Sequence, residues 1–380
     1  MSISVQGTGR IMNTLFSSFK SRLVYGTVAI NFLVLCLAGY SAYTGKIQYD
    51  NQAKVTTENI TRILEKNIDG VLSAVHLALV AEKAEAERQL ATGVIDKSSF
   101  DAHLANILNR IPELTNLRMA DKKGDILYGV KKDDKIANVA DRDYFTALRD
   151  TPSLDMTISK PLLGRVSKKW IIIVAFRVNA PDGSFAGVIH GNIALDYFKK
   201  LFSTLQIGKH GIITLRGEDL TIISRYPETG TSTPGNLAVS QEFTNLAQNG
   251  QPSASYSTVS KIDGIKRQFS YRKFENYPLY INCGIDPHDY LNSWYLESAK
   301  LLAMYTLFLF STLFAARFLL QAWKERQQSL DRLNTLNENL EHRVTERTEE
   351  LRSERQRLTD ILGVCSRNGK NRTLSLGKHS

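Results

Sequence analysis

Two long apolar runs interrupt the mixed hydrophobic and polar pattern of the chain. The first covers residues 23–45, which contain no charged side chain and one strongly polar one, Asn31. The second covers residues 301–323 and is interrupted by Arg317. At about 1.5 Å per residue, a helix of either length spans the roughly 30 Å hydrocarbon core of a bilayer. We expect two transmembrane helices, with Asn31 facing a neighbouring helix; a cleaved signal peptide is the alternative for the first run.

The residues that flank these runs indicate their orientation. Basic side chains lie before the first run and after the second (Arg10, Lys20, Arg22, Lys324 and Arg326). Trp294, Tyr295 and Trp323 are placed where aromatic belts lie at membrane interfaces. The excess of basic residues predicts that both termini, residues 1–22 included, are cytoplasmic. Residues 46–300 are then expected outside the inner (plasma) membrane.

Residues 46–111 have helical periodicity. Apolar side chains recur every three or four positions and form one stripe (Ile60, Leu64, Ile68, Val71, Val75 and Leu79). The polar positions beside them are expected to form a solvated face (Glu58, Arg62, Glu65, Lys66 and Asp69). A second amphipathic stretch, Phe100–Ile111, ends before a proline.

After these helices the pattern changes to the alternation typical of strands. Turn signals separate strand-like runs, most clearly Pro181–Ser184, which lies between Trp170–Val178 and Phe185–Ile193. The pattern then begins again. We expect an α+β fold with two modules, residues 112–205 and 206–290, each an antiparallel sheet with helices on one face.

Several short motifs occur in order across residues 46–295: Asp141–Phe145, Ile158–Pro161, Gly164-Arg165, Asp182–Gly187, Asp196–Phe198, Ser224–Pro227, Asp263-Gly264 and Tyr277-Pro278. Together they resemble double Cache (PDC-type) sensors of bacterial transmembrane receptors, similar to those fused to diguanylate cyclases and histidine kinases. The resemblance implies tandem PAS-like modules on a long N-terminal helix. It also implies that the membrane-distal module (residues 112–205, the distal module) holds a ligand, rather than the membrane-proximal one (residues 206–290, the proximal module).

The resemblance further implies a pocket between the distal sheet and the residues around Asp141. Arg142 is a candidate to hold a carboxylate in a bidentate manner, and Tyr144 to supply a ring wall with a polar tip. A local ion pair with Asp141 or Asp143 is the alternative for Arg142. Trp170 is a further candidate wall residue, with a core or edge position as its alternative.

Two residues of one strand bear on the nature of the ligand. In the amino-acid-binding branch of the family, the resemblance implies an aspartate that holds the ammonium group at the position of Asn192. A neutral amide cannot neutralise an ammonium ion, so a carboxylate or other small anion fits this pocket better than an amino acid. His190 is a candidate pH-sensitive residue, with simple packing as its alternative. The expected partner is a small organic acid or an amino-acid-like molecule.

The charge and cysteine distributions exclude other classes. The net charge is +10, but residues 46–300 carry 32 basic and 29 acidic residues, and no segment is a dense basic block. This pattern disfavours nucleic-acid binding. The three cysteines lie in different segments, and no cysteine or histidine cluster has metal-site spacing. We therefore expect no cofactor and no disulfide within the sensor.

Residues 324–362 carry a heptad pattern. Its a positions are Leu330, Asn337, Val344, Leu351 and Leu358, and its d positions are Leu333, Leu340, Arg347, Glu354 and Ile361. This seam predicts a parallel two-stranded coiled coil, and thus a homodimer or heterodimer; a helix lying on the membrane surface is the alternative. Residues 363–380 are expected to form a disordered tail.

The sequence contains no cyclase signature, P-loop or kinase nucleotide-binding motif. We therefore expect a sensory receptor without catalytic activity of its own. The alternatives are the truncated sensor part of a diguanylate cyclase or histidine kinase, and a dimerisation partner of such proteins that senses nothing.

Overall fold

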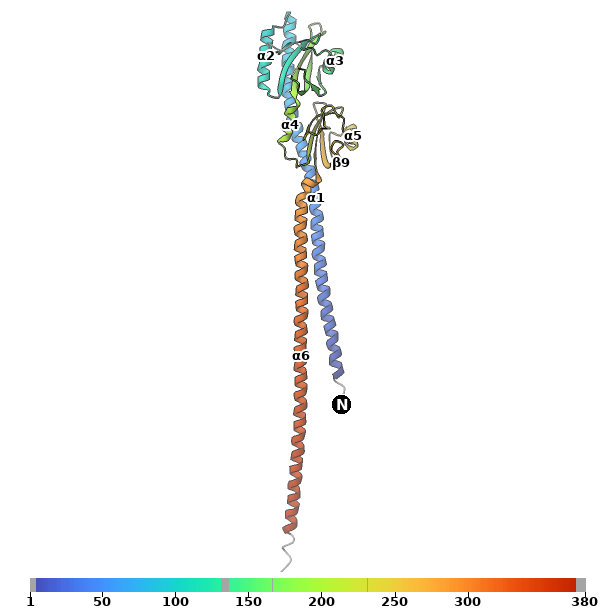
Figure 1. The fold of residues 1–380 in the computed structure, drawn as a ribbon, viewed down its shortest axis with the longest axis vertical. Helices are drawn as coiled ribbons and strands as arrows, with labels where there is room; N and C mark the ends of the chain where they lie inside the picture. Colours follow the sequence, from blue (N-terminus) through green and yellow to red (C-terminus); the bar gives the residue numbers. More distant parts are fainter. Residues whose placement is uncertain (1–4, 131–136, 166, 231, 374–380) are drawn as a thin grey trace, which may run out of the picture. The chain divides into compact units, whose positions relative to one another are not determined.

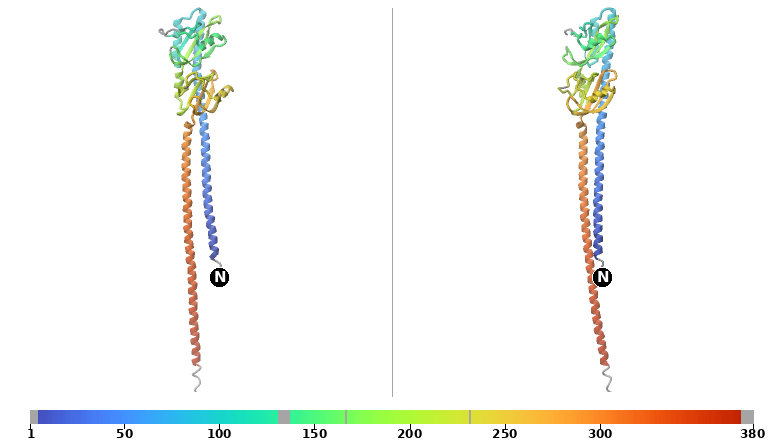
Figure 2. Two further views of the ribbon diagram at one scale, coloured as in Figure 1. Left: turned by 45° about the vertical axis from the view of Figure 1, so that its right-hand side comes forward. Right: turned by 90° about the vertical axis from the view of Figure 1, so that its right-hand side faces the viewer.

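The computed structural model describes residues 5–130, 137–165, 167–230 and 232–373 (Figure 1). The chain divides into two compact units. One is Ser41–Ala299, here called the sensor unit; the other combines Met1–Tyr40 with Lys300–Ser380 and is called the helical unit. Helices α1 (Val5–Thr92) and α6 (Pro287–Thr373) each contribute to both. Figure 2 shows the two sheets of the sensor unit at successive levels along α1.

The distal module is an antiparallel sheet with three helices. Its sheet has the order β2-β1-β6-β5-β3, and β4 also pairs with β5. The strands are β1 (Leu114–Asp121), β2 (Ile126–Tyr128), β3 (Met156–Ile158), β4 (Leu162–Leu163), β5 (Trp170–Asn179) and β6 (Phe185–Ala194). The helices are α2 (Lys97–Arg110), α3 (Asp143–Asp150) and α4 (Leu195–Ser203).

The proximal module repeats this plan with fewer elements. Its sheet has the order β8-β7-β11-β10-β9 and is antiparallel throughout. The strands are β7 (Ile212–Gly217), β8 (Ile222–Tyr226), β9 (Ser253–Val259), β10 (Lys266–Lys273) and β11 (Leu279–Ile285), and the helix is α5 (Gln241–Gln248). The expected α+β fold, with two PAS-like sheets on a long N-terminal helix, is confirmed.

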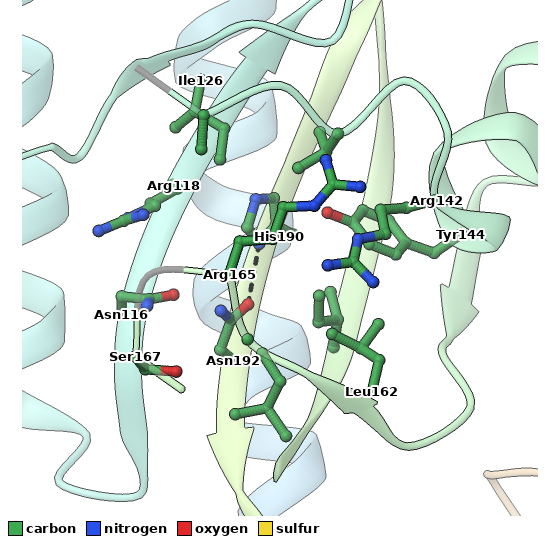
Figure 3. A pocket seen from close by; sticks show the side chains of 15 residues that line it. Asn116, Arg118, Ile126, Arg142, Tyr144, Leu162, Arg165, Ser167, His190 and Asn192 are labelled. Atoms are coloured by element: carbon green, nitrogen blue, oxygen red, sulfur yellow. Dashed lines mark hydrogen bonds between the residues drawn. The ribbon is translucent and has the colours of Figure 1, made fainter. Parts of the chain in front are cut away.

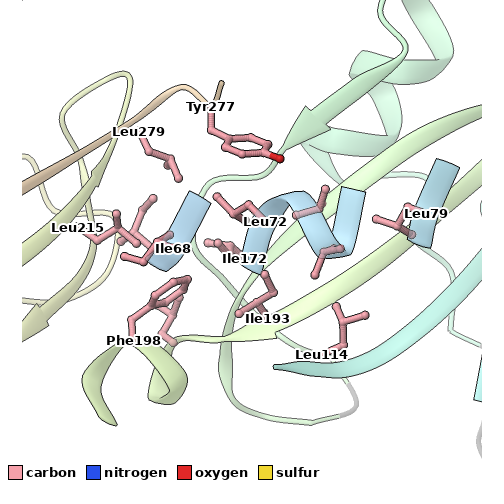
Figure 4. Close-up of a cluster of buried hydrophobic side chains, with 14 of the residues drawn as sticks. Ile68, Leu72, Leu79, Leu114, Ile172, Ile193, Phe198, Leu215, Tyr277 and Leu279 are labelled. Carbon is pink, nitrogen blue, oxygen red and sulfur yellow. The ribbon is translucent and has the colours of Figure 1, made fainter. Parts of the chain in front are cut away.

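One apolar stripe of α1 packs against both sheets. Its buried side chains lie in one cluster with residues from each sheet (Leu64, Ile68, Leu72, Val75 and Leu79 with Leu114, Ile172, Ile193, Leu215 and Leu279; Figure 4). The stripe follows the predicted one except in a single turn, where Leu72 is buried and Val71 is half-buried. Burial of each large aliphatic side chain contributes about 1.5–3 kcal/mol, so this stripe is the main attachment of both modules to α1.

The predicted solvated face of α1 is wrong at Glu65. This carboxylate is buried and lies 3.8 Å from Nε of Arg272 in β10. Glu58, about two turns earlier along the helix, accepts a hydrogen bond of 2.7 Å from Ser255 in β9. The proximal sheet therefore covers part of the polar side of α1 and supplies these carboxylates with partners, as burial of a charge requires.

A helix covers the other face of each sheet, whereas helices on one face were predicted. Phe145 of α3 lies in a second distal cluster with Ile173, and Phe243 of α5 lies in a proximal cluster with Tyr271 and Tyr280. The cause is visible in β5, which is buried at nearly every position. A strand covered on both faces is apolar throughout rather than alternating.

The helical unit joins the two apolar runs. Asn31 of α1 faces α6 as expected: its Nδ2 donates to Oγ1 of Thr312 at 3.0 Å and to the Thr27 carbonyl at 2.8 Å. The rings of Phe19 and Trp323 stack with centroids 5.0 Å apart. By length and composition alone, α1 and α6 are each able to cross a membrane. An amide in such a helix is tolerated when a neighbouring helix supplies its partner.

Helix α6 extends beyond the predicted coiled coil. It continues to Thr373 and so includes the first part of the segment predicted to be a disordered tail, residues 363–380. The remainder of the predicted tail, residues 374–380, lies outside the described residues.

Candidate functional site

A small cavity of about 50 Å³ lies in the distal module between the sheet and α3. Strands β1 and β6 form its floor, and α3 and the turn after β4 contribute side chains from the other side (Figure 3). Its polar lining comes from Asn116, Arg118, Arg142, Tyr144, Arg165, Ser167, His190 and Asn192, and its apolar lining includes Ile126, Leu162, Ile171 and Ile173.

The floor of the cavity is a set of four polar side chains on paired strands. Asn116 lies opposite Asn192 in the register of β1 and β6, and Arg118 lies opposite His190. Nδ1 of His190 and Oδ1 of Asn192 form a buried hydrogen bond of 3.0 Å. The second ring nitrogen, Nε2, and Oδ1 of Asn116 are buried without a hydrogen-bond partner. Buried polar atoms are usually paired, so these two atoms are the positions where a ligand would be recognised.

Burial controls the protonation state of His190 in the floor of the cavity. Desolvation lowers the pKa of His190 to about 4, opposed by the hydrogen bond to Asn192 and assisted by the nearby charge of Arg118. The imidazole is therefore neutral at pH 7. Because the amide oxygen of Asn192 accepts a hydrogen bond, the ring proton is on Nδ1, and Nε2 presents a lone pair to the cavity.

The wall opposite the floor is cationic. Nη2 of Arg142, which precedes α3, lies 3.4 Å from the carbonyl oxygen of Leu163. Arg165 donates to the carbonyl of Asn138 and to the carboxylate of Asp141. In Figure 3 both guanidinium groups lie on the side of the cavity where the Tyr144 hydroxyl points inward.

Tyr144 stays protonated in this setting. Burial raises the pKa of its phenol, and the positive charges of Arg142 and Arg165 only partly oppose the shift. Its ring centroid lies 5.6 Å from that of His190. The hydroxyl can therefore act as a donor to a ligand held between the arginines and the histidine.

The structure brings four of the six predicted site residues together: Arg142, Tyr144, His190 and Asn192 line one cavity. Asp141 and Trp170 are not among its lining residues. Asp141 is exposed and pairs with Arg165. Trp170 does not line the cavity because side chains alternate between the two faces of a strand. Ile171 and Ile173 of β5 line the cavity, so Trp170 belongs to the alternate set of positions, on the other face.

Sequence reasoning missed Asn116, Arg118 and Arg165 as lining residues. The signal for the first two lies in the alternation of β1: Leu117 and Met119 enter the α1-side core, so Asn116 and Arg118 share the opposite face. Two polar side chains on a sheet face that a helix covers indicate a site. Arg165 follows a tight turn at Gly164, where a Cβ atom would lie 2.3 Å from Oγ of Ser167.

A family comparison agrees with this architecture. A family model of the Cache domain, dCache_1, matches residues 46–294 of the 380. The chain belongs to the Cache domain family. No curated protein matches it by sequence. With the two apolar helices, a Cache domain indicates a membrane-anchored sensor protein.

Solved structures support the Cache fold. The extracellular domain of rpHK1S-Z16, a candidate histidine kinase, superposes with a TM-score of 0.56 at 22% identity, over 62% of this chain and 95% of that one. The extracellular domain of mmHK1S-Z3, another candidate histidine kinase, superposes with a TM-score of 0.50 at 12% identity, over 65% of this chain and 97% of that one. The ligand-binding domain of the Campylobacter jejuni chemoreceptor Tlp3, in complex with L-valine, superposes with a TM-score of 0.47 at 13% identity, over 65% of this chain and 97% of that one. At these identities the first two likenesses support the fold alone.

Metal binding has no structural support in the described part of the chain. Within residues 5–130, 137–165, 167–230 and 232–373, no group of three or more His, Cys, Asp or Glu side chains is arranged to hold a metal ion.

Proposed function

We propose that this protein is a transmembrane sensory receptor whose distal Cache module binds a small organic carboxylate outside the cell. The observation that carries the proposal is the charge of the cavity. Arg118, Arg142 and Arg165 line it, and no carboxylate is present among its described lining residues. A guanidinium group matches a carboxylate in charge and in bidentate geometry.

The same lining disfavours an amino-acid ligand. An ammonium group requires a carboxylate or several acceptors, and the position implied for that carboxylate is Asn192, whose Oδ1 already accepts from His190. The size of the cavity narrows the choice further. A volume of about 50 Å³ holds only a few water-sized groups, which favours a short-chain acid of about four to six non-hydrogen atoms.

The route of the signal runs through α6, which begins within the sensor unit. At its start, Trp294 donates to the carbonyl of Ala42 at 2.9 Å, and the Tyr290 hydroxyl donates to Asp50 at 2.9 Å. Both bonds attach the first turns of α6 to α1. We propose that ligand binding changes the packing on α1 and shifts α6 along or about its axis, with both termini in the cytoplasm.

The cytoplasmic part of α6 is proposed to be a parallel coiled coil in a homodimer or heterodimer. The described leucines and valine of the heptad seam are exposed in the single chain (Leu330, Leu333, Leu340, Val344, Leu351 and Leu358). A second helix would remove them from water. In this proposal residues 1–380 sense and transmit, and catalysis is the task of an output domain coupled to the coiled coil.

A thermal-shift screen of the full chain in lipid nanodiscs tests the proposed function. The panel comprises short carboxylic acids, amino acids and amines at matched ionic strength. We expect short carboxylates to raise the melting temperature of the sensor unit and amines to leave it unchanged, because binding to the folded state stabilises it. Stabilisation by amines or amino acids but not by simple carboxylates would contradict the proposal.

A further inference from the structure

A second cavity, of about 30 Å³, lies at the corresponding place in the proximal module. Strand register shows the correspondence. In the distal module Asn116 of β1 pairs with Asn192 of β6; in the proximal module Thr214 of β7 pairs with Asn282 of β11. All four residues line their cavities.

The correspondence extends to charge and to the covering helix. Arg118 follows Asn116 by two residues, and Arg216 follows Thr214 by two residues, so each cavity has an arginine at the same position of its sheet. Tyr144 of α3 covers the distal cavity, and Phe243 of α5 covers the proximal one. The two modules thus repeat a cavity as well as a fold.

Two arginines of the proximal cavity are buried and only partly paired. Arg216 donates from Nη1 to the Leu220 carbonyl at 2.6 Å and from Nη2 to the Ala238 carbonyl at 2.7 Å, while its Nε has no partner. Arg225 donates from Nη2 to Asp263 at 2.6 Å, while its Nε and Nη1 have none. Both residues are at least 96% buried, being 4% and 2% exposed. Unpaired guanidinium donors at this depth are costly unless a further acceptor is present.

The charge of this region is not balanced by its acidic residues. Asp263 already accepts two hydrogen bonds from Arg267, at 2.8 and 3.0 Å, in addition to the one from Arg225. Two guanidinium groups, those of Arg225 and Arg267, therefore share this carboxylate, whereas Arg216 donates to backbone carbonyls. No acidic residue is among the described residues that line the cavity. Burial lowers the pKa of Arg216 only to about 10, so it remains a cation at neutral pH.

The rest of the lining combines polar side chains with aromatic and apolar ones; the polar residues are Thr214, Ser240, Thr258, Ser260, Lys261 and Asn282. Tyr256 stacks on Phe243 and on Phe269, with interplanar angles of 5° and 13°, and all three rings line the cavity with Ile212. A cavity lined by both guanidinium donors and aromatic rings suits an anion with a small apolar end. Its volume leaves room for about two to four non-hydrogen atoms, which favours formate and acetate over larger acids.

We propose that the proximal module has its own ligand site, in which Arg216 and Arg225 bind a one- or two-carbon carboxylate. The site is separate from the distal cavity and does not depend on the ligand proposed there. A receptor with two such sites reads the concentration of small acids through both modules of its Cache domain.

Calorimetric titration of the full chain in nanodiscs with sodium acetate and with sodium formate tests this site. The decisive variant is Asn282→Asp, which places a fixed carboxylate of nearly unchanged shape beside the arginines. We expect it to abolish the proximal binding event and to raise the melting temperature without ligand, because it supplies the missing negative charge. Thr214→Asp introduces the carboxylate from the paired strand and serves if Asn282→Asp does not fold.

The matched control is Asn192→Asp, the same substitution at the register-equivalent distal position. It is expected to remove only the distal event. Carboxylate binding that survives Asn192→Asp and disappears in Asn282→Asp or Thr214→Asp supports the proximal site, whatever becomes of the distal proposal. If the folded Asn282→Asp and Thr214→Asp proteins retain every binding event of the wild type, the proximal site does not exist.

Discussion

His190 and Asn192, two residues apart on β6, form a buried hydrogen bond of 3.0 Å between Nδ1 and Oδ1. This bond orients the imidazole and directs Nε2 to the cavity between the distal sheet and α3. Burial, assisted by the charge of Arg118, holds the ring neutral even though the bond to Asn192 raises the pKa of His190: a protonated imidazole would be a further buried positive charge in a cationic site.

The first prediction concerns the stability of the folded protein at low pH. The pKa of His190 is about 4 when folded and near its ordinary value of 6.5 when unfolded. Between these values the unfolded chain binds more protons, so stability falls as the pH drops from about 6.5 to about 4. Protonation of His190 is expected to lower the free energy of unfolding by on the order of 3 kcal/mol over this interval.

Denaturant unfolding of the wild type and His190→Gln at pH 7 and pH 4.5 measures this loss. The glutamine side chain does not titrate, so the variant should lose less stability than the wild type over this interval. Comparison with the variant removes the contributions of the other histidines. Equal losses in both proteins would show that His190 is not held neutral by burial.

The second prediction concerns ligand selectivity. Because Nε2 of His190 presents a lone pair and has no partner in the protein, a ligand with a hydroxyl group beside its carboxylate can donate to it. We expect 2-hydroxypropionate to bind about tenfold more tightly than propionate, which corresponds to one added hydrogen bond of about 1.4 kcal/mol. Calorimetry on the wild type and on His190→Gln compares the two acids. A preference of the same size in both proteins would assign the hydroxyl contact to another residue.

The third prediction concerns the packing of the modules on α1. Leu72 is buried in the cluster between α1 and the sheets, whereas Leu77 on the same helix is 70% exposed. Leu72→Ala should lower the free energy of unfolding of the sensor unit by about 2–5 kcal/mol through lost burial and a residual cavity. Leu77→Ala should change it by no more than about 0.5 kcal/mol. Similar effects of the two substitutions in denaturant titrations would contradict the observed face of α1.

Position 72 illustrates how far the sequence alone can be interpreted. Val71 and Leu72 fit the spacing between Ile68 and Val75 equally well, because steps of three and four residues are both helical. Only the sheets decide which of the two is covered. The two long strands β5 and β6 were predicted to within one residue at their ends, because the turn signal Pro181–Ser184 separates their apolar runs.

Partners from distant segments were not predictable. Glu65 is buried because Arg272, more than two hundred positions later in the chain, lies beside it. Arg165 reaches the cavity because a turn at Gly164 places it there. Trp170 does not line the cavity because its position in β5 belongs to the opposite face of the sheet. The residue types of the site could be recognised from the sequence, but their convergence required the register of the sheet.

The fourth prediction concerns the dimer. Leu340, at a d position of the predicted coiled coil, is 58% exposed in the single chain. Leu340→Cys in a Cys36→Ser, Cys365→Ser background should form a disulfide between two copies under mild oxidation in membranes, because d positions of parallel helices face each other. His342→Cys, on the outer face, is the control. Equal crosslinking at both positions would contradict the register, and none at Leu340→Cys would contradict a parallel homodimer.

The central claim is that the distal cavity holds a carboxylate through Arg142, and the binding affinity of Arg142→Ala tests it most directly. Arg149→Ala is the matched control, since Arg149 lies in α3 and pairs with exposed Asp150, away from the cavity lining. The measurement is titration calorimetry on the full chain with the carboxylate that stabilises the wild type most. We expect Arg142→Ala to bind this carboxylate at least about tenfold more weakly, because a charged hydrogen bond contributes about 1.5–3 kcal/mol. Arg149→Ala should bind it with unchanged affinity. An unchanged affinity in Arg142→Ala would contradict the claim.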